Sequence, residues 1–368
     1  MRAATSLVQA GLRGLSTVQV RQVRAVRHGA ARGTVERVYR EVERDFGVLA
    51  PPVILHAPSP DVLAAAWLML RETLLVPAAS PRAVKEAVST AVSKGNECPF
   101  CITMHDSMLQ NLVGYTDGEI ADPRARAAAA WTTANAYSDT GVGHPVPFPV
   151  EQAPEIVGTA VILQYLNRMV NLFLGEVPLP PHTPAAALGV VRRVLVWLIK
   201  SAERRGPQPG ASLDLLPPAP LPSDLAWAAG NTAIAEAFAR GAAAVDEAGR
   251  RSVPVAVREL VHEHLARWDG RPVGLSRAWV EDAVAALPAD DRAAGRLALL
   301  TAFASYQVDQ PVVDGFRARQ PDDRDLTDLT AWASLAASRR VGSWMRIRET
   351  GTETATGDKP ATDSRAAS

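Results

Sequence analysis

The chain has 368 residues, of which 47% are hydrophobic and 21% are charged, a composition typical of globular proteins that are long enough for two units of similar size. Its 39 basic and 39 acidic residues balance, which argues against nucleic acid or a membrane surface as a partner recognised through bulk charge.

The N-terminal segment scatters arginines and has no uninterrupted apolar stretch, so we expect no secretory signal there. Because its first acidic residue is Glu36, an arginine-rich transit peptide is an alternative. We favour a helical extension over 1–45 and a cytoplasmic protein. The most apolar run, 186–200, is too short for a membrane span and contains arginines.

Helical spacing of apolar residues dominates the rest of the chain, and β-branched alternation is scarce. Ser80 is the expected N-cap of one helix, with Pro81 at its first position and Gly95 at its end. We therefore predict an all-α fold. Further helices are expected at 59–74, 123–138, 154–175, 186–204, 222–243, 254–268, 276–286, 290–306 and 325–347.

The order of these helices suggests two tandem copies, because short stretches of the first half recur in order in the second. Glu86 pairs with Glu259 in one such match, and Arg168 pairs with Arg339 in another. The predicted division is 1–45 for the extension, 46–204 for the first unit, 205–224 for a Pro-rich linker, 225–348 for a degenerate second unit and 349–368 for a disordered tail.

The only two cysteines lie in the stretch NECPFCITMHDSM (96–108). Pro99 predicts a helix that starts there with Cys98 as its N-cap, because proline at the first helical position loses no hydrogen bond. Spacings of three and four then place Cys98, Cys101 and His105 on one face. The helix N-terminus favours the thiolate, and His105 is placed to take the proton of Cys101. We therefore predict a dithiol redox site.

Other interpretations of the cysteine pair stay open. A structural zinc site needs four ligands, and beyond His105 only Glu97 or Asp106 is close in sequence. Two inert cysteines in the core are a further alternative. Attachment of c-type haem is excluded because Ile102, and no histidine, follows Cys101. We expect neither a metal nor a cofactor.

The spacing of Glu86, Cys98, Cys101 and His105 resembles the AhpD-like alkylhydroperoxidases of the carboxymuconolactone decarboxylase superfamily. The resemblance implies an all-helical oligomer, with the second half as a degenerate copy of the same domain. Where some members have a histidine before the second cysteine, this chain has Phe100.

By this resemblance, Cys101 attacks a small hydroperoxide and Cys98 resolves the product to a disulfide. His105 deprotonates Cys101, and Glu86 completes the relay through a water. An external dithiol carrier, lipoyl- or thioredoxin-like, restores the thiols. Two alternative functions remain: a decarboxylase or lactone-handling enzyme like the superfamily's namesake, and a non-enzymatic oligomer whose dithiol is redox-responsive or structural.

Overall fold

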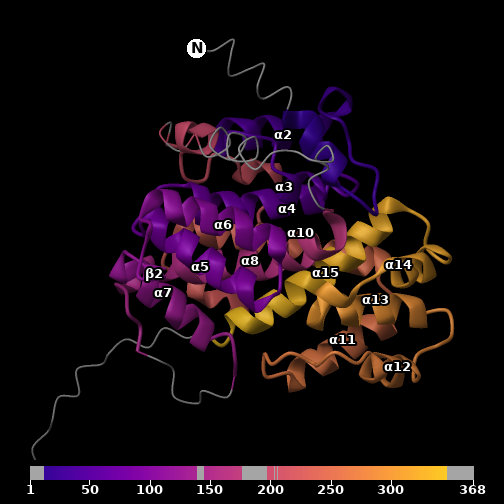
Figure 1. Ribbon diagram of the computed structural model, residues 1–368. Helices are drawn as coiled ribbons and strands as arrows, with labels where there is room; N and C mark the ends of the chain where they lie inside the picture. Colours follow the sequence, from indigo (N-terminus) through magenta and orange to yellow (C-terminus); the bar gives the residue numbers. More distant parts are fainter. Residues whose placement is uncertain (1–11, 139–144, 176–196, 203, 205, 346–368) are drawn as a thin grey trace, which may run out of the picture.

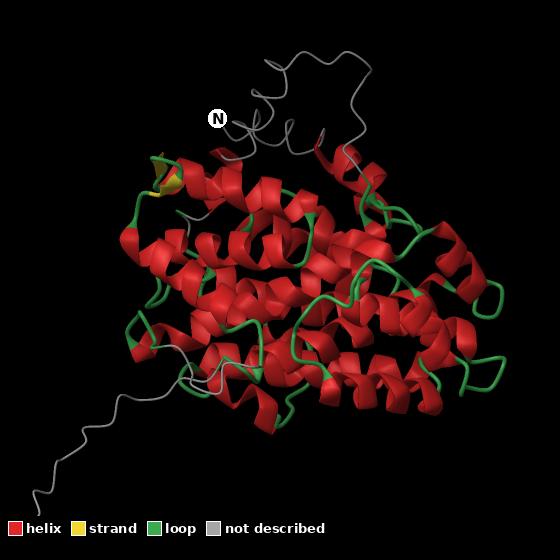
Figure 2. Ribbon diagram, turned by 60° about the horizontal axis from the view of Figure 1, so that its bottom comes forward, coloured by secondary structure: helices red, strands yellow, loops and turns green. Residues whose placement is uncertain are grey.

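A computed structural model describes residues 12–138, 145–175, 197–202, 204 and 206–345. Helices make up most of these residues, which confirms the predicted all-α class (Figure 2). In the part of the chain described, the strands are a single short antiparallel hairpin, β1 (Tyr115–Thr116) and β2 (Glu119–Ile120).

The α-helices divide into two successive groups along the chain. Those of the first half are α2 (Gly33–Asp45), α3 (Pro51–Ile54), α4 (Pro60–Leu70), α5 (Arg82–Gly95), α6 (Pro99–Leu112), α7 (Pro123–Ala134) and α8 (Ala153–Phe173). Those of the second half are α10 (Thr232–Ser252), α11 (Val255–Arg267), α12 (Ala278–Val284), α13 (Arg292–Phe303), α14 (Gln310–Arg317) and α15 (Asp323–Gly342).

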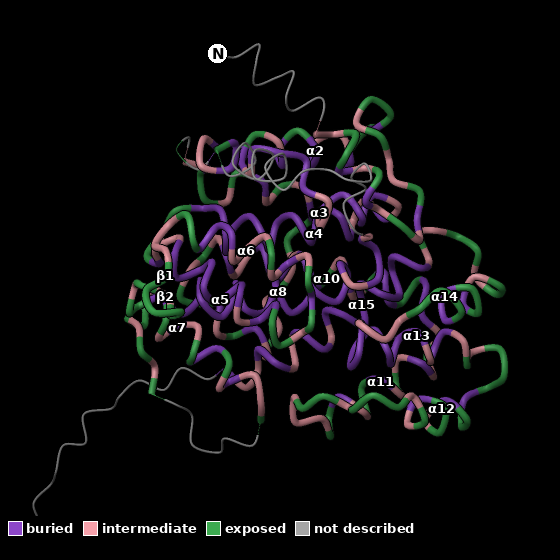
Figure 3. The backbone as a smooth tube through the Cα atoms, in the orientation of Figure 1, coloured by how far each residue is buried: buried purple, intermediate pink, exposed green. Residues whose placement is uncertain are grey.

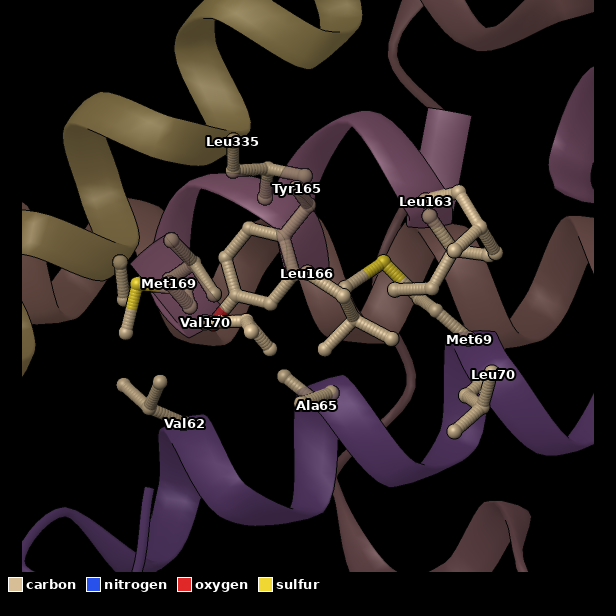
Figure 4. Packing of buried hydrophobic residues seen from close by; sticks show 14 of the residues in the cluster. Val62, Ala65, Met69, Leu70, Leu163, Tyr165, Leu166, Met169, Val170 and Leu335 are labelled. Carbon is tan, nitrogen blue, oxygen red and sulfur yellow. The ribbon is translucent and has the colours of Figure 1, made fainter. Parts of the chain in front are cut away.

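Four central helices join the two halves: α4 packs along α10, α8 packs along α15, and α10 contacts α15 (Figure 1). Figure 4 shows part of this core, where Ala65 and Met69 of α4 face Leu166 of α8 and Leu335 of α15 lies nearby. Gly249 of α10 permits the close approach to α15, since a Cβ there would lie 2.3 Å from Cδ1 of Trp332. The halves therefore share one continuous hydrophobic core.

The helix α8 is buried along nearly its whole length (Figure 3). The segment Val150–Phe173 is long and apolar enough to cross a membrane, but 94% of its most apolar window is buried inside the protein. A helix that is hydrophobic all round belongs in a large core as readily as in a bilayer. Around it, α5, α6 and α7 cover the core on one side. On the other side, α11, α12 and α14 pack against α13, which packs against α15.

Several predicted boundaries were wrong. The helix expected to start at Pro81 begins at Arg82, and the backbone N–H of Ser80 donates to Glu155 instead of Ser80 capping the helix. Two segments replace the helix expected at 222–243: a short 3₁₀ turn (Ser223–Ala228) and the longer α10. The hairpin and α14 were not predicted. Most of the helix expected at 186–204 and the whole tail 349–368 lie outside the described residues.

The tandem duplication and the domain boundaries stay predictions. In favour of the duplication, two helices that it matches, α8 and α15, pack on each other. The segment predicted as a Pro-rich linker contacts the first half. The backbone N–H of Gly210 donates to Glu72, and Asp214 pairs with Arg37.

A buried ion cluster ties α2 to the π-helical segment Arg71–Leu75 that follows α4. Nε of Arg71 lies 2.7 Å from Asp45, and its Nη1 pairs with Glu72. All three side chains are almost fully buried. Burial raises the pKa of Asp45, but hydrogen bonds from Arg44 and Arg71 outweigh it and leave that pKa below its ordinary value. Burial raises the pKa of Glu72.

Replacing Arg71 with methionine is expected to lower the free energy of unfolding by about 3–5 kcal/mol, because it leaves buried carboxylates without their cation. Urea unfolding at neutral pH measures the loss. Arg44→Met is the matched control, since Arg44 pairs with the same Asp45 from an exposed position, and its cost should be below about 1 kcal/mol. Equal losses in the two variants would contradict the role assigned to burial.

Candidate redox site

The redox stretch lies where α5 ends and α6 begins. As predicted, α5 ends at Gly95, Cys98 is the N-cap of α6 and Pro99 takes its first position. Between them, Glu97 has a φ of 49°, a left-handed conformation that residues other than glycine rarely adopt. This turn lets the N–H of Cys98 donate to the carbonyl of Ser93 at 3.1 Å, which fixes the first cysteine against the end of α5.

The two thiols are in contact and buried. Their sulfurs lie 2.8 Å apart, so one thiol donates to the other, and both are free cysteines. Cys98 is 0% exposed and Cys101 is 4% exposed. Disulfide formation requires the sulfurs to approach to about 2.05 Å, a small movement. The pair is therefore placed for intramolecular oxidation, under the surface rather than on an open helix face.

Burial reverses the expected effect of the helix N-terminus on Cys101. Loss of solvent raises the pKa of Cys101 well above its ordinary value, and the hydrogen bond and charge of Cys98 raise it further. We expected the helix N-terminus to favour the thiolate, but at Cys101 burial acts in the opposite direction because it disfavours the charged form. Cys101 rests as a thiol, so reaction at neutral pH requires a group that accepts its proton.

His105 and Glu86 supply a candidate for that group. Nδ1 of His105 lies 2.7 Å from Oε2 of Glu86, a direct contact where the sequence interpretation placed a water. Glu86 is 1% exposed. Burial would raise its pKa, but the charge of Arg82 and then the contact with His105 outweigh burial and leave the pKa below its ordinary value. Glu86 is therefore an anion at neutral pH.

The carboxylate sets the tautomer of the histidine. An anionic partner at Nδ1 holds the proton on that nitrogen, which leaves Nε2 of the neutral ring with a free lone pair. Among the described residues, Nε2 has no hydrogen-bond partner, and His105 is not hydrogen-bonded to Cys101. The structure thus joins Glu86 to His105 and Cys98 to Cys101, while both Cys101 and His105 lie on α6, one turn apart.

Arg82 is a residue that the sequence interpretation missed. Its Nε donates to Oε1 of Glu86 at 2.7 Å, and its Nη1 donates to the carbonyl of Leu74 at 3.0 Å. Each carboxylate oxygen of Glu86 therefore has its own partner, which fixes the oxygen that faces His105. The spacing of Arg82 and Glu86, four residues apart on one helix, was a readable signal for this pair.

Two further sequence-based expectations concern the surroundings of the pair. Across the described ranges, no three His, Cys, Asp or Glu side chains gather as metal ligands would. Phe100 is partly buried and packs against the core. Some proteins with a similar spacing of the two cysteines and the histidine have a second histidine at this position. Phe100 contributes apolar surface and no proton acceptor.

The buried thiols should react more slowly in the folded protein than in the unfolded chain. We expect alkylation by iodoacetamide at pH 7 to be at least about tenfold slower without urea, because the raised pKa of Cys101 lowers its thiolate fraction. The midpoint of the rate against pH should lie above that of the urea-unfolded protein. A midpoint below it would show that the helix N-terminus stabilises the thiolate after all.

The amino-acid sequence is similar to that of a known protein over nearly its whole length. The chain is 37% identical over 332 residues to alkyl hydroperoxide reductase Rv2159c of Mycobacterium tuberculosis, across 89% of this chain and 95% of that protein. No family model matches the chain, and no solved structure matches it. Because the alignment spans nearly all of both sequences, the similarity extends far beyond the stretch 96–108 and includes both halves of the chain.

Proposed function

Because the chain belongs to the family of alkyl hydroperoxide reductase Rv2159c, we propose that it is a thiol-dependent peroxidase that reduces small alkyl hydroperoxides. The observation that carries this proposal is the pair of buried sulfurs 2.8 Å apart, on the helix that also presents His105 to Glu86. A finer assignment is part of the proposal: the chain is an AhpD-like member of the carboxymuconolactone decarboxylase superfamily, on the spacing of Glu86, Cys98, Cys101 and His105.

In the first step, Cys101 attacks the terminal oxygen of the hydroperoxide. A sulfur electron pair forms the S–O bond, the O–O bond breaks, and Nε2 of His105 takes the thiol proton and passes it to the departing alkoxide. The products are an alcohol and a sulfenic acid on Cys101. Glu86 stabilises the positive charge that His105 carries during the transfer, and Arg82 holds Glu86 in position.

In the second step, the sulfur of Cys98 attacks the sulfenic sulfur of Cys101. Water leaves, a disulfide forms, and the two electrons taken by the hydroperoxide have come from the two thiols. The short distance between the sulfurs supports this assignment, because a sulfenic acid on Cys101 forms beside its resolving thiol. An external dithiol carrier, lipoyl- or thioredoxin-like, then reduces the disulfide by thiol–disulfide exchange.

The site of action and the assembly are further parts of this proposal. We place the enzyme in the cytoplasm, where a reducing environment returns the disulfide to the dithiol. We also propose that it is a homo-oligomer, on the resemblance to the helical peroxidases. Sedimentation of the purified chain tests the oligomer, since a monomer at micromolar concentration would contradict it.

Steady-state turnover tests the proposed activity. The reduced protein is mixed with tert-butyl hydroperoxide and dihydrolipoamide, and loss of hydroperoxide is followed against a protein-free control. Sustained, protein-dependent consumption with one dithiol oxidised per hydroperoxide is the expected result. Oxidation of Cys98 and Cys101 without turnover would instead indicate a redox-responsive protein. No reaction at either thiol would leave a structural role.

A further inference from the structure

A cavity of about 500 Å³ lies between the two halves of the chain. Its first-half wall comes from α5, α7, α8 and the hairpin, and its second-half wall comes from the segments around Trp268 and Phe303. Its lining includes small side chains, such as Ala91 and Ala129, and aromatic residues. None of the four proposed redox residues lines it.

Arg168 of α8 is the main polar feature of this cavity. The residue is 5% exposed, and it lines the space. Its Nε donates to the carbonyl of Ala302 at 3.0 Å, and its Nη1 donates to the carbonyl and side-chain oxygens of Gln164. All three acceptors are neutral. Within the described part of the chain, its Nη2 has no hydrogen-bond partner and no carboxylate pairs with the guanidinium.

The corresponding arginine in the second half gives an internal comparison. Arg339 of α15, which the sequence matches pair with Arg168, also lies on a central helix but is paired with Asp224 at 2.7 Å and with Asp246 at 3.1 Å. Buried cations in proteins are normally paired with anions. The second half supplies its own anions, whereas the first half leaves its arginine facing a cavity.

The remaining charges at the cavity do not neutralise Arg168. Arg126 is paired with Glu119 at 3.0 Å, which leaves Lys94 and Glu97, both at the exposed rim. Burial lowers the pKa of Arg168 to about 10, so the group remains a cation at neutral pH. An anion that enters the cavity therefore meets a positive charge held by fixed hydrogen bonds.

We propose that this cavity binds a small organic carboxylate with an apolar or aromatic body, whose carboxylate pairs with Arg168. Arginine presents its N–H groups in a fork that suits a carboxylate, and such charge-assisted bonds are strong where water is excluded. The apolar body lies against the alanine and aromatic walls. A pocket that is mostly apolar with one convergent charge is typical of a small-molecule site. This proposal does not rest on the peroxidase activity.

Calorimetric titration of the full chain tests the proposal with octanoate, with 1-octanol as the uncharged probe and inorganic phosphate as the anion without an apolar body. Octanoate should bind once per chain, at least about tenfold more tightly than either comparison probe. Arg168→Gln should weaken octanoate about ten- to hundredfold and leave 1-octanol nearly unchanged. Arg126→Gln is the matched control, because its guanidinium already has a partner, and it should change octanoate affinity less than about threefold.

Ala91→Trp supplies a test that leaves Arg168 in place. The indole fills the cavity from α5, and it should remove binding of octanoate and 1-octanol alike. Four results would overturn the proposal: no octanoate binding at about 1 mM, equal affinity for octanoate and 1-octanol, full octanoate affinity in folded Arg168→Gln, or full affinity in Ala91→Trp. Should Arg168→Gln fail to fold, the probe comparison in the unaltered chain and Ala91→Trp decide the question.

Discussion

Replacing Cys101 with serine is expected to reduce turnover of tert-butyl hydroperoxide at least about a thousandfold. Serine preserves the size of this buried side chain, so the fold should persist. Its hydroxyl is a poor nucleophile toward a peroxide oxygen, and it cannot form a disulfide with Cys98. Steady-state consumption of hydroperoxide in the presence of dihydrolipoamide measures the loss.

Cys98→Ser is the matched control, because it removes the neighbouring thiol at the same 2.8 Å contact. This variant should still react once per chain and stop as a sulfenic acid on Cys101, which dimedone traps for mass spectrometry. Dimedone could instead trap a sulfenic acid at Cys98 in the Cys101→Ser variant and none at Cys101 in the Cys98→Ser variant. That result would show that Cys98 attacks the hydroperoxide and Cys101 resolves the product.

Replacing Glu86 with glutamine is expected to lower kcat/KM for the hydroperoxide by about 10²–10⁴ at pH 7. The amide retains the size of the carboxylate but lacks the charge that holds the proton on Nδ1 of His105. Glu86 does not touch the reacting atoms, so its role is that of a positioning residue. Since the pKa of Cys101 is raised, the rate in the unaltered enzyme depends on a correctly oriented base.

The pH profile separates this role from a general loss of structure. As pH rises toward the pKa of Cys101, the thiol ionises without help, so the deficit of Glu86→Gln should shrink. Glu155→Gln is the control: Glu155 forms another buried ion pair, with Lys85 of the same α5 at 2.6 Å, and does not contact His105. Its folded fraction should retain normal activity. A deficit in Glu86→Gln that is constant with pH, or matched by Glu155→Gln, would contradict the relay.

Local signals in the sequence predicted the part of the redox site that one helix determines. Pro99 marked the start of α6 with Cys98 as its N-cap, and Gly95 marked the end of α5. These rules act over a few residues, so they transfer directly to the structure. The hairpin was missed even though Asp117 and Gly118 both have positive φ, a turn pair that the sequence displayed between its two short strands.

Such local rules do not predict which helices contact each other. The position of Glu86 beside His105 came only from the family resemblance, because it depends on how α5 packs against α6. The pKa of Cys101 required the burial of the thiol, which spacing along one helix does not contain. Likewise, nothing in the sequence showed that Arg339 has aspartate partners and that Arg168 has none among the residues that the structure describes.

A single-turnover thiol titration tests the central claim most directly, that Cys98 and Cys101 together reduce one hydroperoxide. The chain contains two cysteines, so the count is unambiguous. With one equivalent of tert-butyl hydroperoxide, the reduced protein should lose both thiols, release one tert-butanol and yield a peptide with Cys98 disulfide-bonded to Cys101. Retention of both thiols, or a disulfide only between separate chains, would contradict the account.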